Sequence, residues 1–308
     1  MPGAFPLLEL LQIFVDNIAP ILMIAGVGYV VGRRLQIEVQ SLGRLIFYIF
    51  TPALVFQRLS TSDVSGGELG LLFILTMLFQ VILALIAYIT LRVRGVGPIY
   101  RANVMISAFS LNAGNYGLSL ISFAFGPDVV ARAAIIFIAN ITLNFTLGVY
   151  VASSGRKAPH KAVASILRVP AVYATAAAFI VNGFQIALPL PLERSISSLA
   201  EAAIPGMLIL LGLQLARTAR LVRPKLIGFG VVLKLGLSPF VAVILAGLVG
   251  LNDAARIAFI LQTSMPVAVA TIILATEFDL DAEFALGTIL VSTLISPLTL
   301  SVLIFLLR

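Results

Sequence analysis

Two asparagines and two glycines interrupt an apolar run over residues 101–125 that is otherwise long enough to cross a bilayer. Glycine weakens a helix, and asparagine brings amide donors and acceptors into it. Hydrocarbon offers no partner for the backbone groups that such a break frees, so protein or water must supply one. We therefore expect this broken helix to line a binding site. The residues expected at the site are Asn112, Gly114, Asn115, Tyr116 and Gly117.

A second break, formed by Ser264, Met265 and Pro266, interrupts the apolar run over residues 255–276. Ser264 lies 154 residues after Ser110, which is half of the 308-residue chain. Paired breaks in two halves of a chain indicate the binding site of a secondary transporter. Each second half-helix would begin near the bilayer centre with free N–H groups, and Pro266 suits the first turn of such a half-helix. Two positive helix ends would favour an anion, above all a carboxylate.

These polar residues also have purely structural interpretations. Glycines permit close helix packing, and asparagines can join helices inside a membrane. Lys234 lies deep inside an apolar run, where it could attract an anionic substrate, act as an internal counter-ion, or snorkel towards the cytoplasm. Asn140 and Asn144 share a helix face, and together with Ser292 they could line the cavity or form interhelical hydrogen bonds.

The composition is that of a polytopic membrane protein. Hydrophobic residues make up 60% and charged residues 11% of the chain, whereas soluble domains carry about 25% charged residues. Fourteen of the 20 basic residues fall in loops on one predicted side and five on the other, which puts the first side in the cytoplasm and both termini outside. Five spans in each half predict that residues 1–154 and 155–308 form inverted repeats. The ten expected spans lie roughly at 7–31, 42–59, 69–91, 101–125, 130–153, 169–187, 195–216, 224–250, 255–276 and 284–307.

Several other functions are disfavoured. The chain has no cysteine and only one histidine, His160, in a basic loop, so neither a metal nor another cofactor is expected. No acid–base or nucleophilic constellation points to an enzyme, and no ring of charge points to a channel. The basic residues do not form one patch, so nucleic acid is not an expected partner. A membrane receptor or scaffold without flux is the alternative to a transporter.

Four segments along the whole chain carry a resemblance to the auxin efflux carrier family, within the bile-acid, arsenite and riboflavin transporter superfamily. They are Leu45–Leu54, Asn112–Leu118, Ala203–Pro205 with Leu210–Leu215, and Ser264–Pro266 with Val291–Leu294. Ser119 stands where this family usually has proline, so the first break must depend on Gly114 and Gly117.

The resemblance implies an all-α protein with ten transmembrane helices. Helices 1, 2, 6 and 7 would form a scaffold, through which homodimers form, and helices 3–5 and 8–10 a transport domain with crossing broken helices 4 and 9. The substrates would be organic anions, auxin-like monocarboxylates or small dicarboxylates, carried across the cell membrane by alternating access. At the positions that match the family's crossover, Asn112 and Asn115 would hold the substrate carboxylate, and Pro266 would shape the second broken helix. Neither break contains a carboxylate, which disfavours sodium coupling, while Asp16 and Glu201 could exchange protons or simply be exposed at the interface.

Overall fold

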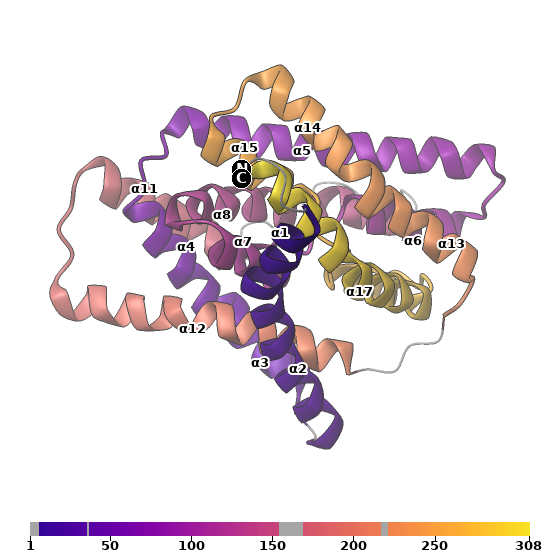
Figure 1. Ribbon diagram of the computed structural model, residues 1–308, viewed down its shortest axis with the longest axis horizontal. Coiled ribbons are helices and arrows are strands. Elements are labelled where there is room, and N and C mark those ends of the chain that lie inside the picture. Colours follow the sequence, from indigo (N-terminus) through magenta and orange to yellow (C-terminus); the bar gives the residue numbers. More distant parts are fainter. Residues whose placement is uncertain (1–5, 36, 154–168, 217–220) are drawn as a thin grey trace.

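The computed structural model describes residues 6–35, 37–153, 169–216 and 221–308. This part of the chain is almost entirely helical (Figure 1), and its single β feature is an isolated antiparallel bridge between Leu111 and Val267. By length and composition, seven of its helical segments could cross a membrane, and each corresponds to an expected span. They are Leu7–Arg34, Val39–Ser60, Gly66–Val93, Pro127–Ala152, Leu190–Leu215, Pro224–Val249 and Ala282–Leu307.

Three of these segments are single α-helices, and the other four contain a π turn between α-helices. The single helices are α5 (Gly66–Val93), α12 (Leu190–Leu215) and α17 (Ala282–Leu307). The interrupted ones are α1 (Pro6–Ile13), η1 (Phe14–Ile18) and α2 (Ala19–Arg34); α3 (Val39–Leu45), η2 (Ile46–Phe50) and α4 (Thr51–Ser60); α8 (Pro127–Leu143), η4 (Asn144–Gly148) and α9 (Val149–Ala152); and α13 (Pro224–Val231), η5 (Val232–Leu237) and α14 (Ser238–Val249). In three of the four, a proline is the second residue after the π turn, namely Pro20, Pro52 and Pro239. Proline lacks an N–H and its ring crowds the carbonyl four residues earlier, and the wider π turn relieves both problems.

The three remaining expected spans are shorter or broken. The run at 101–125 becomes α6 (Pro98–Phe109), η3 (Ala113–Leu118) and α7 (Ser119–Ala124). The run at 255–276 becomes α15 (Asp253–Thr263) and α16 (Ala270–Glu277), so both predicted interruptions are present. The run at 169–187 becomes α11 (Pro170–Gly183), which has 14 residues and is shorter than the roughly 20 residues that a perpendicular span needs.

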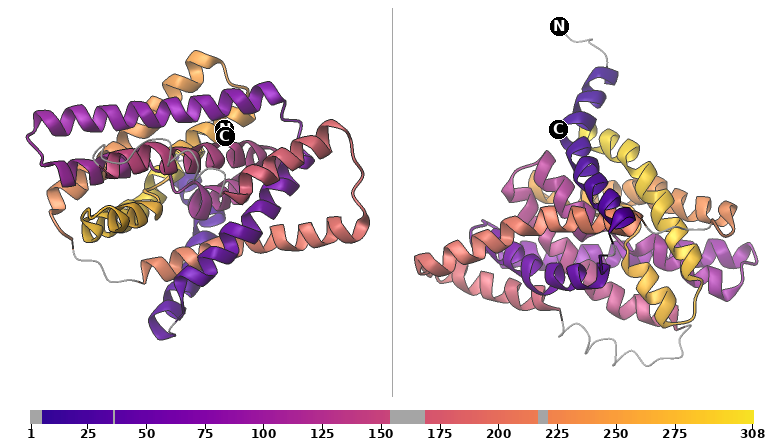
Figure 2. Two further views of the ribbon diagram at one scale, coloured as in Figure 1. Left: turned by 180° about the vertical axis from the view of Figure 1, so that it is seen from behind. Right: turned by 90° about the horizontal axis from the view of Figure 1, so that it is seen from below.

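Two helix pairs, α2 with α12 and α4 with α11, pack closely (Figures 1 and 2). Glycine lets the backbones of α2 and α12 touch. A Cβ atom on Gly212 would lie 1.9 Å from the Ala25 carbonyl oxygen, and one on Gly28 would lie 2.3 Å from that of Ile209. Small residues at such crossings allow apolar helices to approach closely in a membrane.

Helix α8 occupies the centre of the molecule. Every residue from Val129 to Leu143 is buried, and the helix packs against α5, α15 and η3. The outer faces of α2, α14 and α17 instead expose large apolar side chains, among them Val27, Phe240 and Leu298, as expected for surfaces that contact lipid. The predicted boundary at 154 and 155, and the loop that contains His160, lie outside the described residues.

Candidate functional site at the two helix breaks

The two interruptions meet inside the molecule. Leu111 and Val267 form the antiparallel bridge, and the Asn112 N–H donates to the Pro266 carbonyl at 2.9 Å. Both segments are therefore extended where they meet, and each is buried. A crossing of this kind brings together two chain segments from opposite halves of the sequence.

Asparagine and glutamine side chains hold the first break. The Asn140 amide in α8 accepts from the Leu111 N–H at 3.1 Å and donates to the Leu111 carbonyl at 2.9 Å. Gln80 in α5 donates to Asn140 Oδ1 at 2.8 Å and to the Phe109 carbonyl at 2.9 Å. These amides replace the helical hydrogen bonds that the interruption removes, as buried backbone groups require.

Two further expected site residues bond to groups beside the breaks. Asn144 Oδ1 accepts from the Ser110 hydroxyl at 2.7 Å, and the Ser292 hydroxyl oxygen accepts from the Val267 N–H at 3.1 Å. Asn144 also donates to Asn140 at 3.4 Å, which confirms that these two share a helix face. All three side chains are buried, so the geometry matches the interhelical interpretation, and a role in lining an open cavity stays a prediction.

Gln262, which is not among the expected site residues, joins the two breaks. Its Nε2 donates to the Ala113 carbonyl at 3.2 Å and to the Ala133 carbonyl at 3.1 Å. Gly117 makes room for it, because a Cβ atom there would lie 2.1 Å from Gln262 Oε1 and 3.2 Å from Met265 Cγ. An amide side chain two residues before Ser264, where the second break begins, was the signal that could have revealed Gln262.

One sequence expectation about the second break is wrong. Pro266 does not lie in the first turn of a half-helix, because α16 begins at Ala270. The hydrogen bond from Asn112 and the bridge to Val267 keep the chain extended there. The N–H groups of Leu111, Asn112 and Val267 are consequently paired with protein acceptors rather than free.

Free donors do remain at both half-helix starts. Among the described residues, no acceptor pairs with the backbone N–H groups of Ala113, Gly114 and Asn115, or with those of Ala268, Val269 and Ala270. The Asn112 Nδ2 atom, on a side chain that is 4% exposed, also lacks a partner within that part of the chain. Unpaired donors at two positive helix ends can bind an anion.

The other expected site residues differ in accessibility. Gly114 and Asn115 are partly exposed, whereas Tyr116, Ser264 and Met265 are fully buried. The Ser264 hydroxyl donates to the Ile260 carbonyl at 2.6 Å, while the Tyr116 hydroxyl has no hydrogen-bond partner among the described residues.

Lys234, in η5, is fully buried, so it does not snorkel to the surface. Its Nζ donates at 3.3 Å to the carbonyl of Thr263, the last residue of α15. No carboxylate of the described residues forms an ion pair with it. A cation at the C-terminal end of a helix is stabilised by the partial negative charge there, and the contact places the amino group of Lys234 directly beside the second break.

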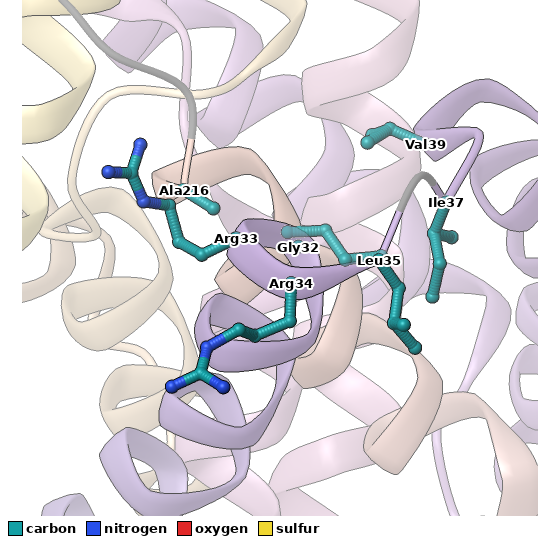
Figure 3. A pocket seen from close by; sticks show the side chains of 8 residues that line it. Gly32, Arg33, Arg34, Leu35, Ile37, Val39 and Ala216 are labelled. Atoms are coloured by element: carbon teal, nitrogen blue, oxygen red, sulfur yellow. The ribbon is translucent and has the colours of Figure 1, made fainter.

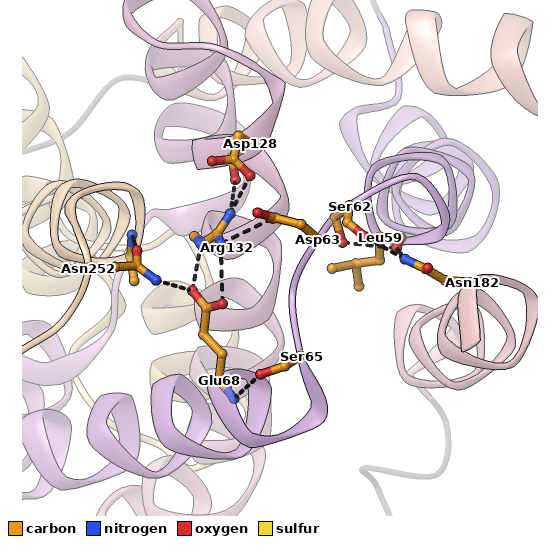
Figure 4. Close-up of polar contacts among 10 residues, drawn as sticks. Leu59, Ser62, Asp63, Ser65, Glu68, Asp128, Arg132, Asn182 and Asn252 are labelled. Atoms are coloured by element: carbon orange, nitrogen blue, oxygen red, sulfur yellow. Dashed lines mark hydrogen bonds and ion pairs between the residues drawn. The ribbon is translucent and has the colours of Figure 1, made fainter. Parts of the chain in front are cut away.

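A separate ion-pair cluster surrounds Arg132 in α8 (Figure 4). Arg132 is one of the five basic residues on the side predicted to face the outside. Arg132 is 4% exposed and donates to Glu68 in α5 at 2.6 Å, to Asp63 after α4 at 3.2 Å, and to Asp128. Glu68 also accepts from Asn252, just before α15, at 3.2 Å. The positive charge of Arg132 and its hydrogen bond lower the pKa of the Asp63 carboxyl. The cluster therefore ties α5, α8, α15 and the loop after α4 together.

Apolar helices of spanning length, combined with two broken helices that meet in the interior, define a multi-pass membrane protein of the transporter class. The comparison with known families agrees. The chain belongs to the family described as "Membrane transport protein", the auxin efflux carrier family, whose model matches residues 13–162 and 154–304.

Relatives of the chain are also named as transporters. A protein of Rhizobium meliloti, provisionally named a malonate transporter, is 30% identical over 306 residues, which cover 94% of this chain and 95% of the relative. An uncharacterized transporter of Methanothermobacter thermautotrophicus is 27% identical over 293 residues, with 92% and 95% covered. Another, of Methanocaldococcus jannaschii, is 23% identical over 308 residues, with 93% and 96% covered. The family resemblance of the sequence is thus confirmed, and membrane transport is the class of function.

Proposed function

We propose that this protein carries a small organic anion, an auxin-like monocarboxylate or a small dicarboxylate, across the cell membrane by alternating access. The observation that carries the proposal is the set of unpaired donors at the two breaks, among them the buried Asn112 Nδ2. A relative provisionally named a malonate transporter supports a dicarboxylate, because malonate has two carboxylates. The family and the relatives favour a transporter over an enzyme.

Each expected site residue has a role in this proposal. Asn112 and Asn115 donate to the substrate carboxylate, helped by the backbone N–H groups that begin at Gly114. Gly117 and Met265 set how closely the two broken helices approach. Lys234 adds a positive charge beside the second break that attracts an anion. The remaining residues shape and support the site: Tyr116, Asn140, Asn144, Ser264, Pro266 and Ser292.

We further propose ten spans in two inverted five-helix repeats, residues 1–154 and 155–308. The contacts between helices support this. In such a repeat each span of the first half corresponds to the span five places later, so the α2–α12 contact corresponds to the α11–α4 contact, and α5–α6 to α14–α15. All four pairs are in contact. The double match of the family model supports it as well. In this scheme spans 1, 2, 6 and 7 form the scaffold, and the other spans rock against it as the transport domain.

The scheme brings further proposals. Both termini face the outside, as the distribution of basic residues predicts. The scaffold spans form the homodimer contact. Coupling, where it exists, uses protons rather than sodium, because neither break supplies a carboxylate.

Transport by purified protein in proteoliposomes tests the function, with radiolabelled malonate as the first substrate and indole-3-acetate as the second. Asn112→Ala and Asn115→Ala should each weaken substrate binding by about 10- to 150-fold, the value of one hydrogen bond to a charged group. Asn103→Ala is the matched control, because within the described part of the chain the side chain of this buried asparagine bonds only inside α6, to the Ile99 carbonyl at 3.3 Å.

Normal binding and flux in both Asn112→Ala and Asn115→Ala would show that the site lies elsewhere. Ligand binding without flux would favour the second candidate function, a membrane receptor that retains the transporter fold. A thermal-shift measurement with the same acids separates the two, since it reports binding whether or not flux occurs.

A further inference from the structure

We propose that a cavity where α2 ends, between α3 and the end of α12, binds the phosphate group of an anionic phospholipid. The cavity has a volume of about 400 Å³ and lies against residues that include Gly32, Arg33, Arg34, Leu35, Ile37 and Leu213 (Figure 3). It is far along the chain from both helix breaks, and no function assigned above uses it.

The local sequence explains why a hollow forms at this position. Helix α2 ends at Arg34, Leu35 is extended, and α3 begins at Val39, so two helices diverge after a very short connection. Gly32 keeps α2 against α12 up to this point, since its Cβ position lies 3.1 Å from both Leu213 Cδ2 and Ala216 Cβ. The close contact of α2 and α12 forms the floor of the cavity, and the diverging α3 leaves it open.

Two exposed arginines border the cavity. Arg33 and Arg34 are exposed, and no carboxylate of the described residues forms an ion pair with either. Figure 3 shows their guanidinium groups extending from the end of α2 in different directions. The acid in the connection, Glu38, is exposed and accepts a hydrogen bond from Ser41. Arginine binds phosphate through paired, charge-assisted hydrogen bonds, so this end of α2 favours a phosphate.

Apolar side chains beside the arginines distinguish a lipid from a free phosphate. Leu35 and Ile37 line the cavity and are 59% and 42% exposed. The face of α2 that leads away from the cavity exposes Val27 and Val30. A phospholipid can place its phosphate at the arginines and its acyl chains on these residues, whereas an inorganic ion would use only the charges. Basic pockets between membrane helices bind anionic head groups in this way.

Lipid binding to the full-length protein tests the assignment, by native mass spectrometry and by thermal shift with phosphatidylglycerol. We expect wild-type protein to bind phosphatidylglycerol saturably and with a raised melting temperature, and to respond to neither phosphatidylcholine nor inorganic phosphate. The double variant R33Q/R34Q should weaken phosphatidylglycerol binding at least about 10-fold, since it removes both positive charges that border the cavity. L35S/I37S keeps the charges and should also weaken binding.

R194Q/R256Q is the matched control, because it removes the same charge from two exposed arginines remote from the cavity. It should bind phosphatidylglycerol as the wild type does. Equal losses in the two arginine variants would reduce the effect to general charge attraction and overturn the proposal. Unchanged binding by R33Q/R34Q, or a full thermal shift with inorganic phosphate alone, would overturn it too. None of these measurements depends on transport activity.

Discussion

Replacing Gly117 with alanine should destabilise the protein by about 1–5 kcal/mol, because the new methyl group enters the crossing of the two broken helices. Its position lies 2.1 Å from Gln262 Oε1 and 2.9 Å from Gln262 Cδ, so the glutamine must move. Movement breaks its hydrogen bonds to the Ala113 and Ala133 carbonyls. Two bonds at about 0.5–1.5 kcal/mol each and overpacking at about 1–3 kcal/mol are partly offset by the better helix propensity of alanine, about 1 kcal/mol.

The free energy of unfolding in mixed micelles measures this effect. Gly228→Ala in α13 is the control, since no described atom outside the surrounding helix turn lies within 4 Å of its Cβ position, and it should be neutral or slightly stabilising. The variant Q262A removes the clashing amide, so G117A should cost clearly less in a Q262A background than in the wild type. If G117A were as stable as the Gly228 control, or if its cost were the same in both backgrounds, the described contact between α15 and the first break would be wrong.

Two further predictions concern the supports of the site. Asn140→Ala should lower the free energy of unfolding by about 1–3 kcal/mol, because it leaves the Leu111 N–H and carbonyl unpaired. Asn144→Ala loses fewer hydrogen bonds, so an equal cost for both variants would contradict the role of Asn140 at the first break. Asp63→Asn should cost about 0–1 kcal/mol at neutral pH. Arg132 holds the pKa of Asp63 below its ordinary 3.8. The stability difference between wild type and Asp63→Asn should therefore persist above that pH and vanish as acid protonates the carboxyl. A stability difference that does not change with pH in chemical unfolding would refute this prediction.

Much of the architecture could be read from local chemistry. The apolar runs are long, and each run that the structure describes is helical, because a chain in hydrocarbon must satisfy its own backbone groups. The two breaks occur where glycine, asparagine and proline weaken helices, which is a property of neighbouring residues. Asn140 and Asn144 share a face because of helical periodicity alone.

The tertiary structure decided how these parts are used. Pro266 favours a helix start by its own geometry, yet it lies in an extended segment because Asn112, from the other half of the chain, bonds to its carbonyl. The long side chain of Lys234 could have reached the surface, but it is fully buried and contacts the last residue of α15. The position of Gln262 beside the second break did not indicate its partners, although its side chain joins the two breaks. Local propensities place helices and their interruptions, whereas hydrogen bonds between residues 29 to 154 positions apart form only when the whole chain packs.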